Sequence, residues 1–266
     1  MTLPMDLVLA RHGQSKENKV LSALMSGKVD KIPDSYLDFP STVWPLTDLG
    51  KDQARQTGAW LKAEFADGFD AYFVSSLIRA IQSASLLGLD VRDWCITSLL
   101  DERSWGDFNH LPKKQMLVQE RRRRACPFYW RPPNAVPCSE HIQTHIHVML
   151  DLLSREYSDK RVLMVGHGES MMMFRCVLEH WTPWEFDEHC RSKSKANVIL
   201  NGHVLHYTRR VPDGSGEVTG EYRWMRSLCP SQPDGCSTQW IQIPPPKRLD
   251  NDDLLDIVTR YSKLFD

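Results

Sequence analysis

Two histidines stand directly after apolar runs that are typical of buried strands. The run at 7–10 ends on Arg11 and His12, and the run at 162–165 ends two residues before His167. An imidazole is a nucleophile or a general base near neutral pH. Ligands of open α/β sheets bind outside the carboxyl ends of the strands. The two junctions therefore predict nucleophilic or acid–base chemistry at one end of a sheet.

Two more charged side chains follow intervening predicted strands. Arg79 lies in the first turns of a helix, where its guanidinium can hold a phosphate bidentately beside a helix N-terminus. Glu102 comes just after another strand, and a carboxyl group in a partly desolvated cleft can act as a general acid. Asp101 competes with Glu102 for that role, and Glu102 could instead pair with Arg103 or cap a turn.

The elements that position these residues alternate between strands and helices. Short buried strands are predicted at 7–10, 70–74, 95–100 and 162–165. Helices are predicted from Thr47 to Phe65, over 75–84, and from Ser139 through Leu153. This alternation favours an α/β fold, a three-layer α/β/α sandwich with a mostly parallel central sheet.

Two segments show no regular pattern. Residues 19–43 are predicted to be irregular, either a binding loop or a surface excursion. Residues 111–137 are predicted to be basic and irregular, with the run Arg121–Arg124 beside aromatic side chains. Four arginines could grip a polyanion, but we interpret most of them as a solvated helix end.

The C-terminal part should extend the sheet and then leave it. Residues 198–207 resemble a hairpin with a type I′ turn at Asn201-Gly202, and 221–226 predict an edge strand. The Pro- and Ser-rich stretch 227–248 is typical of a linker or surface strap. We therefore place a catalytic domain at 1–227 and a C-terminal linker and short helix at 228–266.

The final helix, from Asp250, carries an apolar stripe that another surface must cover. We expect it to dock on its own domain, and the alternative is a partner subunit in a homodimer.

Composition narrows the class of protein. A formal net charge of -1 among 266 residues gives no field that would attract nucleic acid or a membrane surface. Seven cysteines without CxxC spacing favour reduced thiols in a cytoplasmic protein. The sequence shows no basic leader and no apolar stretch of ~20 residues. Neither a signal peptide nor a membrane span is therefore predicted. His141 and His145 lack a carboxylate at useful spacing, so no metal site is predicted.

Together these stretches resemble the histidine phosphatase superfamily, in its phosphoglycerate-mutase-like branch. The resemblance extends over residues 5–207 and keeps the order of the family's motifs. The matching stretches are Arg11-His-Gly-Gln-Ser-Lys-Glu-Asn18, Leu46-Thr-Asp-Leu-Gly-Lys-Asp-Gln-Ala54, Ser75-Ser-Leu-Ile-Arg-Ala-Ile-Gln-Ser-Ala84, Leu100-Asp-Glu-Arg-Ser-Trp-Gly106 and Gly166-His-Gly168.

The resemblance implies a mechanism without metal or cofactor. His12 would attack phosphorus and become phosphohistidine, and Glu102 would protonate the leaving oxygen and then activate water. A backbone acceptor on the other nitrogen of His12 would fix its tautomer. His167 would be protonated, and the two imidazoles would face each other across a cationic hollow. The groups implied to bind the phosphoryl oxygens are Arg11, Asn18, Arg79, His167 and the backbone N–H of Gly168.

Departures from the family's pattern affect the expected substrate. Cys138-Ser-Glu-His141 replaces the usual Gly-Glu-Ser, and Met172 stands where the family often has an arginine. We expect Met171–Met173 to fill core gaps, and the alternative is that one of them forms a wall of the pocket. We expect a phosphatase that hydrolyses the phosphate monoester of a small metabolite. The alternatives are a phosphomutase of the cofactor-dependent phosphoglycerate mutase type and a non-catalytic module that binds a phosphorylated ligand.

Overall fold

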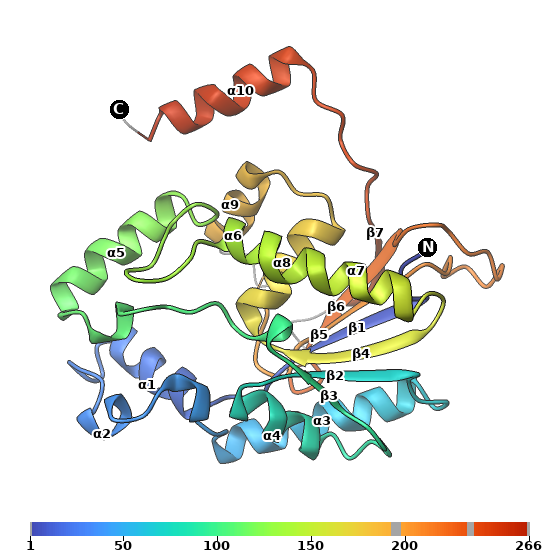
Figure 1. The fold of residues 1–266 in the computed structure, drawn as a ribbon, viewed down its shortest axis with the longest axis horizontal. Helices are drawn as coiled ribbons and strands as arrows, with labels where there is room; N and C mark the ends of the chain where they lie inside the picture. The colour runs from blue at the N-terminus through green and yellow to red at the C-terminus, as the bar shows by residue number, and fades with distance from the viewer. Residues whose placement is uncertain (1, 193–197, 233–236, 265–266) are drawn as a thin grey trace.

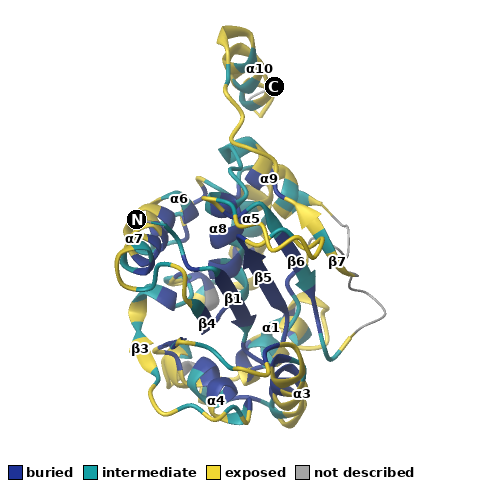
Figure 2. Cartoon of the chain, turned by 90° about the vertical axis from the view of Figure 1, so that its right-hand side faces the viewer, coloured by how far each residue is buried: buried dark blue, intermediate teal, exposed yellow. Residues whose placement is uncertain are grey.

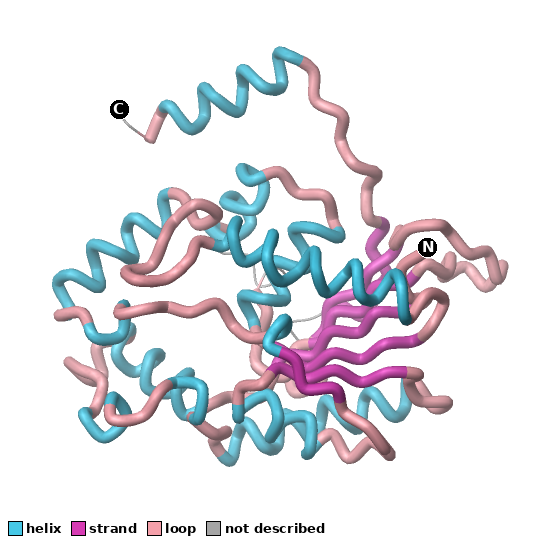
Figure 3. The backbone as a smooth tube through the Cα atoms, in the orientation of Figure 1, coloured by secondary structure: helices cyan, strands magenta, loops and turns pink. Residues whose placement is uncertain are grey.

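The central element is a mixed sheet with the strand order β3-β2-β4-β1-β5-β6-β7 (Figures 1 and 3). The computed structural model describes residues 2–192, 198–232 and 237–264. The strands are β1 (Asp6–Arg11), β2 (Ala71–Ser75), β3 (Cys95–Thr97), β4 (Arg161–Gly166), β5 (Val204–Thr208), β6 (Trp224–Leu228) and β7 (Ser237–Gln242). Strands β3, β2, β4 and β1 pair in parallel, whereas the pairs β1–β5, β5–β6 and β6–β7 are antiparallel.

Helices cover both faces of this sheet (Figure 1). They are α1 (Lys16–Met25), α2 (Asp34–Leu37), α3 (Asp48–Glu64), α4 (Ile78–Leu86), α5 (Lys113–Ala125), α6 (Cys138–His141), α7 (His147–Glu156), α8 (Gly168–Leu178), α9 (Pro183–Arg191) and α10 (Asn251–Ser262). Helices α7 and α8 pack on one face and α3 and α4 on the other. The predicted three-layer α/β/α architecture is confirmed.

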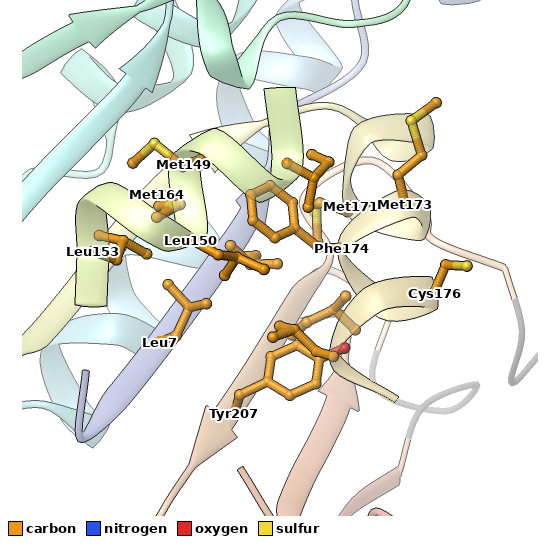
Figure 4. Close-up of a cluster of buried hydrophobic side chains, with 14 of the residues drawn as sticks. Leu7, Met149, Leu150, Leu153, Met164, Met171, Met173, Phe174, Cys176 and Tyr207 are labelled. Carbon is orange, nitrogen blue, oxygen red and sulfur yellow. The ribbon is translucent and has the colours of Figure 1, made fainter. Parts of the chain in front are cut away.

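Strand β1 shows how the sequence fills both interfaces. Leu7 (Figure 4) and Leu9 belong to the core under α7 and α8, and Val8 and Ala10 belong to the core under α3 and α4. Alternate side chains of a strand point to opposite faces. Fully burying each of the larger ones stabilises the fold by about 1.5–3 kcal/mol. Both faces of β1 are therefore anchored, and the end that carries the first histidine is rigid.

The segment predicted to be irregular at 19–43 is partly helical. It contains most of α1, all of α2, and a 3₁₀ turn at Ser41–Val43. Ser15 caps α1, because its hydroxyl accepts from the backbone N–H of Asn18 while the Asn18 side chain accepts from the N–H of Ser15. The prediction was wrong, because Val20, Leu21 and Leu24 form a short apolar stripe on α1 that packs into a small separate core.

Two further predictions from the sequence differ from the structure. Residues 113–125 form helix α5, which buries only Met116 and thus lacks a helical pattern. The strand expected at 95–100 ends at Thr97 and continues as a 3₁₀ turn, Ser98–Leu100. Helices α1 and α5 nevertheless share a small separate core, which includes Leu24, Ile32, Trp44, Phe108, Met116 and Trp130.

The hairpin predicted at 198–207 does not form. Gly202 has a positive φ of 75°, as expected for the turn, but the chain enters β5 only at Val204 and pairs there with β1. Strand β6 is also not an edge strand, because β7 pairs with it inside the stretch predicted as a linker. The sheet therefore continues through Gln242, beyond the predicted domain boundary at residue 227.

Helix α10 projects from the body of the protein (Figure 2). The hydroxyl of Tyr261 donates to Asp187 of α9 at 3.1 Å, so the helix does touch its own domain. The apolar stripe itself stays exposed, with Leu255 at 63%. The expectation that the domain covers this stripe is wrong, and the homodimer stays a prediction. Among the described residues, no helix is both long and apolar enough to cross a membrane.

Candidate active site

The carboxyl ends of the parallel strands meet at one cavity of about 890 Å³. His12 follows β1, His167 follows β4, and Ser75 is the last residue of β2. Glu102 follows the turn after β3. The opposite wall of the cavity comes from α1, α2, the 3₁₀ turn at Ser41–Val43 and α5. Residues from distant parts of the chain therefore converge as the topology of a parallel sheet requires.

The two histidines lie side by side. Their ring centroids are 5.0 Å apart with an interplanar angle of 63°. His12 is 2% exposed and lines the cavity, while His167 is fully buried behind it. The expected hollow between the two rings is absent, because rings this close leave no room for a phosphoryl group. Such a group would bind in front of the pair.

One ring nitrogen of His12 is held by its own neighbour in the chain. Nδ1 lies 2.6 Å from the carbonyl oxygen of Gly13. Because a carbonyl only accepts, Nδ1 carries the proton and the lone pair is left on Nε2. Burial, together with the charges of Arg79 and Arg11, lowers the pKa of His12 well below 6.5. The ring is thus neutral, as a nucleophile must be.

A short hydrogen-bond chain orients His167. The hydroxyl of Ser75 donates to Asp101 at 2.7 Å and accepts from Nε2 of His167 at 2.7 Å. Burial lowers the pKa of His167 well below 6.5, and His12, Arg79 and Arg11 lower it further. In the unliganded site His167 is therefore neutral, contrary to the expected protonated form. A bound phosphate dianion would supply the missing countercharge.

Two arginines give the cavity floor its positive charge. Arg11 donates to the carbonyl of Ile199 at 2.6 Å, and Arg79 donates to the carbonyl of Ser41 at 2.9 Å. Arg79 also lies 3.4 Å from the buried carboxylate of Glu17. Gly168 leaves space for one of these groups: a Cβ at this position would lie 3.0 Å from the Arg11 guanidinium.

Glu102 sits at the N-terminus of helix α8. Its carboxyl oxygens accept from the backbone N–H of Glu169 at 3.3 Å and of Ser170 at 3.1 Å. Burial raises the pKa of Glu102 to about 7, and the nearby Glu169 carboxylate adds to the shift. The helix N–H groups and the arginines oppose it. Glu102 can therefore be protonated or ionised near neutral pH, as a general acid and base requires.

The contacts of Glu102 and its neighbours bear on the alternatives for this position, and Glu102 does cap the first turn of α8 with its carboxyl oxygens. Asp101 accepts from the hydroxyls of Ser75 and Ser76 and from the backbone N–H of Ser76, so its oxygens hold a turn together. Arg103 pairs with Glu169 instead of Glu102. Asp101 and Glu102 both line the cavity, and burial raises the pKa of Glu102 to about 7.

Asn18 also lines the cavity. Its Oδ1 accepts from the backbone N–H of Ser15 and from Nδ2 of Asn201 at 3.0 Å. The Asn18 amide nitrogen is the donor that remains for a ligand. Asn201 in turn donates to the carbonyl of His12 at 3.3 Å, so the segment after β1 is tied to the segment before β5.

Gly13 packs against the start of helix α3. A Cβ there would lie 2.0 Å from the carbonyl oxygen of Gly50, so the missing side chain admits the start of α3 and not a ligand. Met172 lines the cavity, whereas Met171 and Met173 fill the core as predicted.

Sequence reasoning missed four residues of the site: Glu17, Ser75, Arg103 and Glu169. Arg103 has a fully buried side chain and lies over the rings of Trp105 and Trp130, at 5.1 and 5.3 Å. It donates to both carboxylate oxygens of Glu169, at 2.8 and 3.3 Å. The position of Ser75 at the end of a predicted strand could have identified it as a site residue. No local sequence pattern indicates the pairing of Arg103 with Glu169.

An α/β sandwich with a buried histidine pair, a cationic floor and a carboxyl group at its wall defines a class of phosphoryl-transfer proteins. The chain belongs to the histidine phosphatase superfamily (branch 1), whose family model matches residues 7–201.

Curated relatives of this chain are phosphoglycerate mutases. It is 33% identical over 187 residues to a 2,3-bisphosphoglycerate-dependent phosphoglycerate mutase of Methylorubrum extorquens, a match that covers 66% of this chain and 80% of the relative. The enzyme of the same name from Sinorhizobium fredii is 29% identical, with the same coverage of both chains.

Two solved structures with the same fold are phosphatases by name. A mycobacterial glucosyl-3-phosphoglycerate phosphatase has a TM-score of 0.56 at 17% identity and covers 76% of this chain and 92% of its own. A putative α-ribazole-5′-phosphate phosphatase of Escherichia coli has a TM-score of 0.57 at 18% identity, with 82% and 97% covered. At these identities the likeness shows the fold.

Proposed function

We propose that this protein is a metal-independent phosphatase that hydrolyses phosphate monoesters through a phosphohistidine on His12. The observation that carries the proposal is the 2.6 Å contact between Nδ1 of His12 and the Gly13 carbonyl. It leaves Nε2 as the free nucleophile beside Arg11 and Arg79. The phosphatase names of the structural neighbours support the same reading.

The proposed reaction has two displacements. Nε2 of His12 attacks phosphorus, the bond from phosphorus to the ester oxygen breaks, and protonated Glu102 gives its proton to the departing oxygen. Ionised Glu102 then takes a proton from water as the water oxygen attacks the phosphohistidine, and inorganic phosphate leaves with His12 restored. Splitting one displacement into two lowers the barrier of each.

The transition states of both steps carry charge on the phosphoryl oxygens. The proposed donors are the two arginines of the floor, the amide of Asn18, His167 and the N–H of Gly168. They are held in place before the reaction, so they stabilise this charge without a reorganisation cost. Arginines supply the charge that a metal ion provides in other phosphoryl-transfer enzymes, and no cofactor is part of the proposal.

The second candidate is a phosphoglycerate mutase, which the names of the curated relatives favour. A bisphosphorylated primer needs cations beyond the floor of the site. Here the outer arginines are already paired: Arg103 with Glu169, and Arg123 with Glu120 at 2.8 Å. Because these arginines are paired, few cations remain for the second phosphate of a bisphosphorylated primer. This supports hydrolysis of a monoester over the mutase reaction.

Turnover of p-nitrophenyl phosphate in EDTA tests the proposal. We expect the wild type to release phosphate, and His12→Ala to lose the activity, while His147→Ala, an exposed histidine of α7, keeps it. Equal rates for wild type and His12→Ala would refute the catalytic proposal, and no release of phosphate by either would leave the non-catalytic phosphate-binding module. Interconversion of 2- and 3-phosphoglycerate that depends on 2,3-bisphosphoglycerate would identify the mutase instead. The cytoplasmic location stays a prediction.

A further inference from the structure

The cavity is much larger than its phosphate-binding floor. Its volume of about 890 Å³ is typical of sites that enclose an entire drug-sized ligand, whereas a phosphoryl group occupies only a small part of it. The remaining space must accommodate the leaving group of the substrate, and the side chains around that space indicate its chemistry.

One wall of the outer cavity is aromatic. Tyr36, Phe39 and Trp44 line it, and the rings of Tyr36 and Trp44 are 5.0 Å apart in a T-shaped contact. The indole N–H of Trp44 donates to the carbonyl of Phe39 at 3.2 Å, so its polar edge is satisfied within the wall. Phe39 is 61% exposed, which leaves a large aromatic surface that a ligand could desolvate.

Trp105 adds another aromatic ring to the cavity lining, and it packs against the same small core as Tyr36 and Trp44. Trp105 lines the cavity and lies between two cations, with Arg103 at 5.1 Å and Arg123 at 5.9 Å from its ring centroid. Met172, Val198 and Ile199 add apolar surface nearby. These rings are held by their own contacts, so they can bind a leaving group without being ordered by it.

Two arginines of the outer cavity are paired with carboxylates, although Nη1 of Arg103 has no hydrogen-bond partner among the described residues. Arg123 donates to both carboxylate oxygens of Glu120, at 2.8 and 2.9 Å, and Arg103 does the same with Glu169. A leaving group with its own carboxylate or phosphate would have to compete with these ion pairs. An apolar leaving group meets no such competition.

The geometry points to phosphate monoesters of aryl or arylalkyl alcohols as the substrate class, with the ring of the leaving group held against the aromatic lining formed by Tyr36, Phe39, Trp44 and Trp105. This inference rests on the proposed function, since it places the phosphate at His12. It differs from a preference for small anionic esters such as phosphoglycerates.

Two alkyl esters with similar leaving alkoxides test the preference. We expect kcat/KM for 2-phenylethyl phosphate to exceed that for ethyl phosphate by about tenfold or more, mainly through KM, because the extra ring buries apolar area. Phe39→Ala should reduce this ratio severalfold. Leu117→Ala, an exposed apolar residue of α5 outside the cavity lining, should leave it unchanged. A ratio near one in the wild type would overturn the inference.

Binding of non-hydrolysable phosphonates separates this inference from the proposed function. By calorimetry, 2-phenylethylphosphonate should bind more tightly than ethylphosphonate, and 2-carboxyethylphosphonate more weakly than either. This order of affinities would support the substrate class even if no monoester were hydrolysed, an outcome that would refute only the phosphatase. Equal affinities, or tightest binding of the carboxylate, would refute the substrate class even in an active phosphatase.

Discussion

The imidazoles of His12 and His167 contact each other edge to face, with ring centroids 5.0 Å apart. Two protonated rings at this distance, beside two arginines, would repel strongly. Both rings are accordingly neutral in the unliganded site, and their lowered pKa values follow from burial and from the surrounding cations. The site is therefore arranged to receive negative charge, and a phosphate dianion provides it.

Ser75 should matter through His167. Ser75→Ala leaves Nε2 of the buried imidazole without its 2.7 Å partner, which costs about 1–3 kcal/mol of stability. We expect kcat to fall about tenfold or more as the ring loses its orientation. Ser76→Ala is the matched control, because the Ser76 hydroxyl also binds Asp101. Equal effects of the two variants on kcat would contradict the role of the chain.

Glu102→Gln should slow esters with poor leaving groups most. We expect a loss of about 10²–10⁴ in kcat for an alkyl phosphate and a far smaller loss for p-nitrophenyl phosphate, whose leaving group needs no proton. In the wild type the rate on the alkyl ester should fall as pH rises through about 7, where Glu102 loses its proton. A uniform loss across leaving groups would refute the proton-donor role.

The same substitution should stabilise the fold at alkaline pH. The pKa of Glu102 in the folded protein is about 7 against an ordinary value of 4.5, so folding favours its protonated form. Wild-type stability should therefore fall as pH rises from about 5 to about 7. At pH about 8, Glu102→Gln should be more stable by roughly 1–3 kcal/mol, and below pH about 4 the difference should vanish. Urea unfolding at both pH values measures this, and a less stable variant at alkaline pH would disprove it.

Gly168→Ala should disturb the position of Arg11. The new methyl group would lie 3.0 Å from the guanidinium, so the arginine must shift. A misplaced phosphate ligand can reduce kcat/KM by about 10²-fold. Gly220→Ala is the control, because nothing lies within 4 Å of a Cβ there. Unchanged kinetics in Gly168→Ala would show that Arg11 has no close role in phosphate binding.

The sequence predicted the parallel half of the sheet and the meeting of its strand ends well. Buried strands are local patterns, and Arg11, His12 and His167 occupy fixed positions relative to them. Once strands β1 and β4 pair in register, these residues must lie together. The geometric part of the site prediction thus follows from short-range patterns combined with one rule of topology.

The rest depends on contacts between distant parts of the chain. The turn residues Asn201-Gly202 predict a hairpin, but β5 pairs with β1 and β6. The packing of the core determines this pairing, and the turn does not. Helix α1 has a capping box, but its short apolar stripe packs against side chains from distant segments of the chain. The pairing of Arg103 with Glu169 brings together residues from two separate segments. Local patterns carry no information about such partners.

The most direct test of the account is to trap the covalent intermediate. The wild type is mixed with a radiolabelled phosphate monoester, quenched during turnover, digested, and analysed by mass spectrometry. We predict acid-labile, alkali-stable phosphate on the peptide that contains His12, and none in His12→Ala. Turnover without any label on that peptide, or with the label on another residue, would contradict the proposed mechanism.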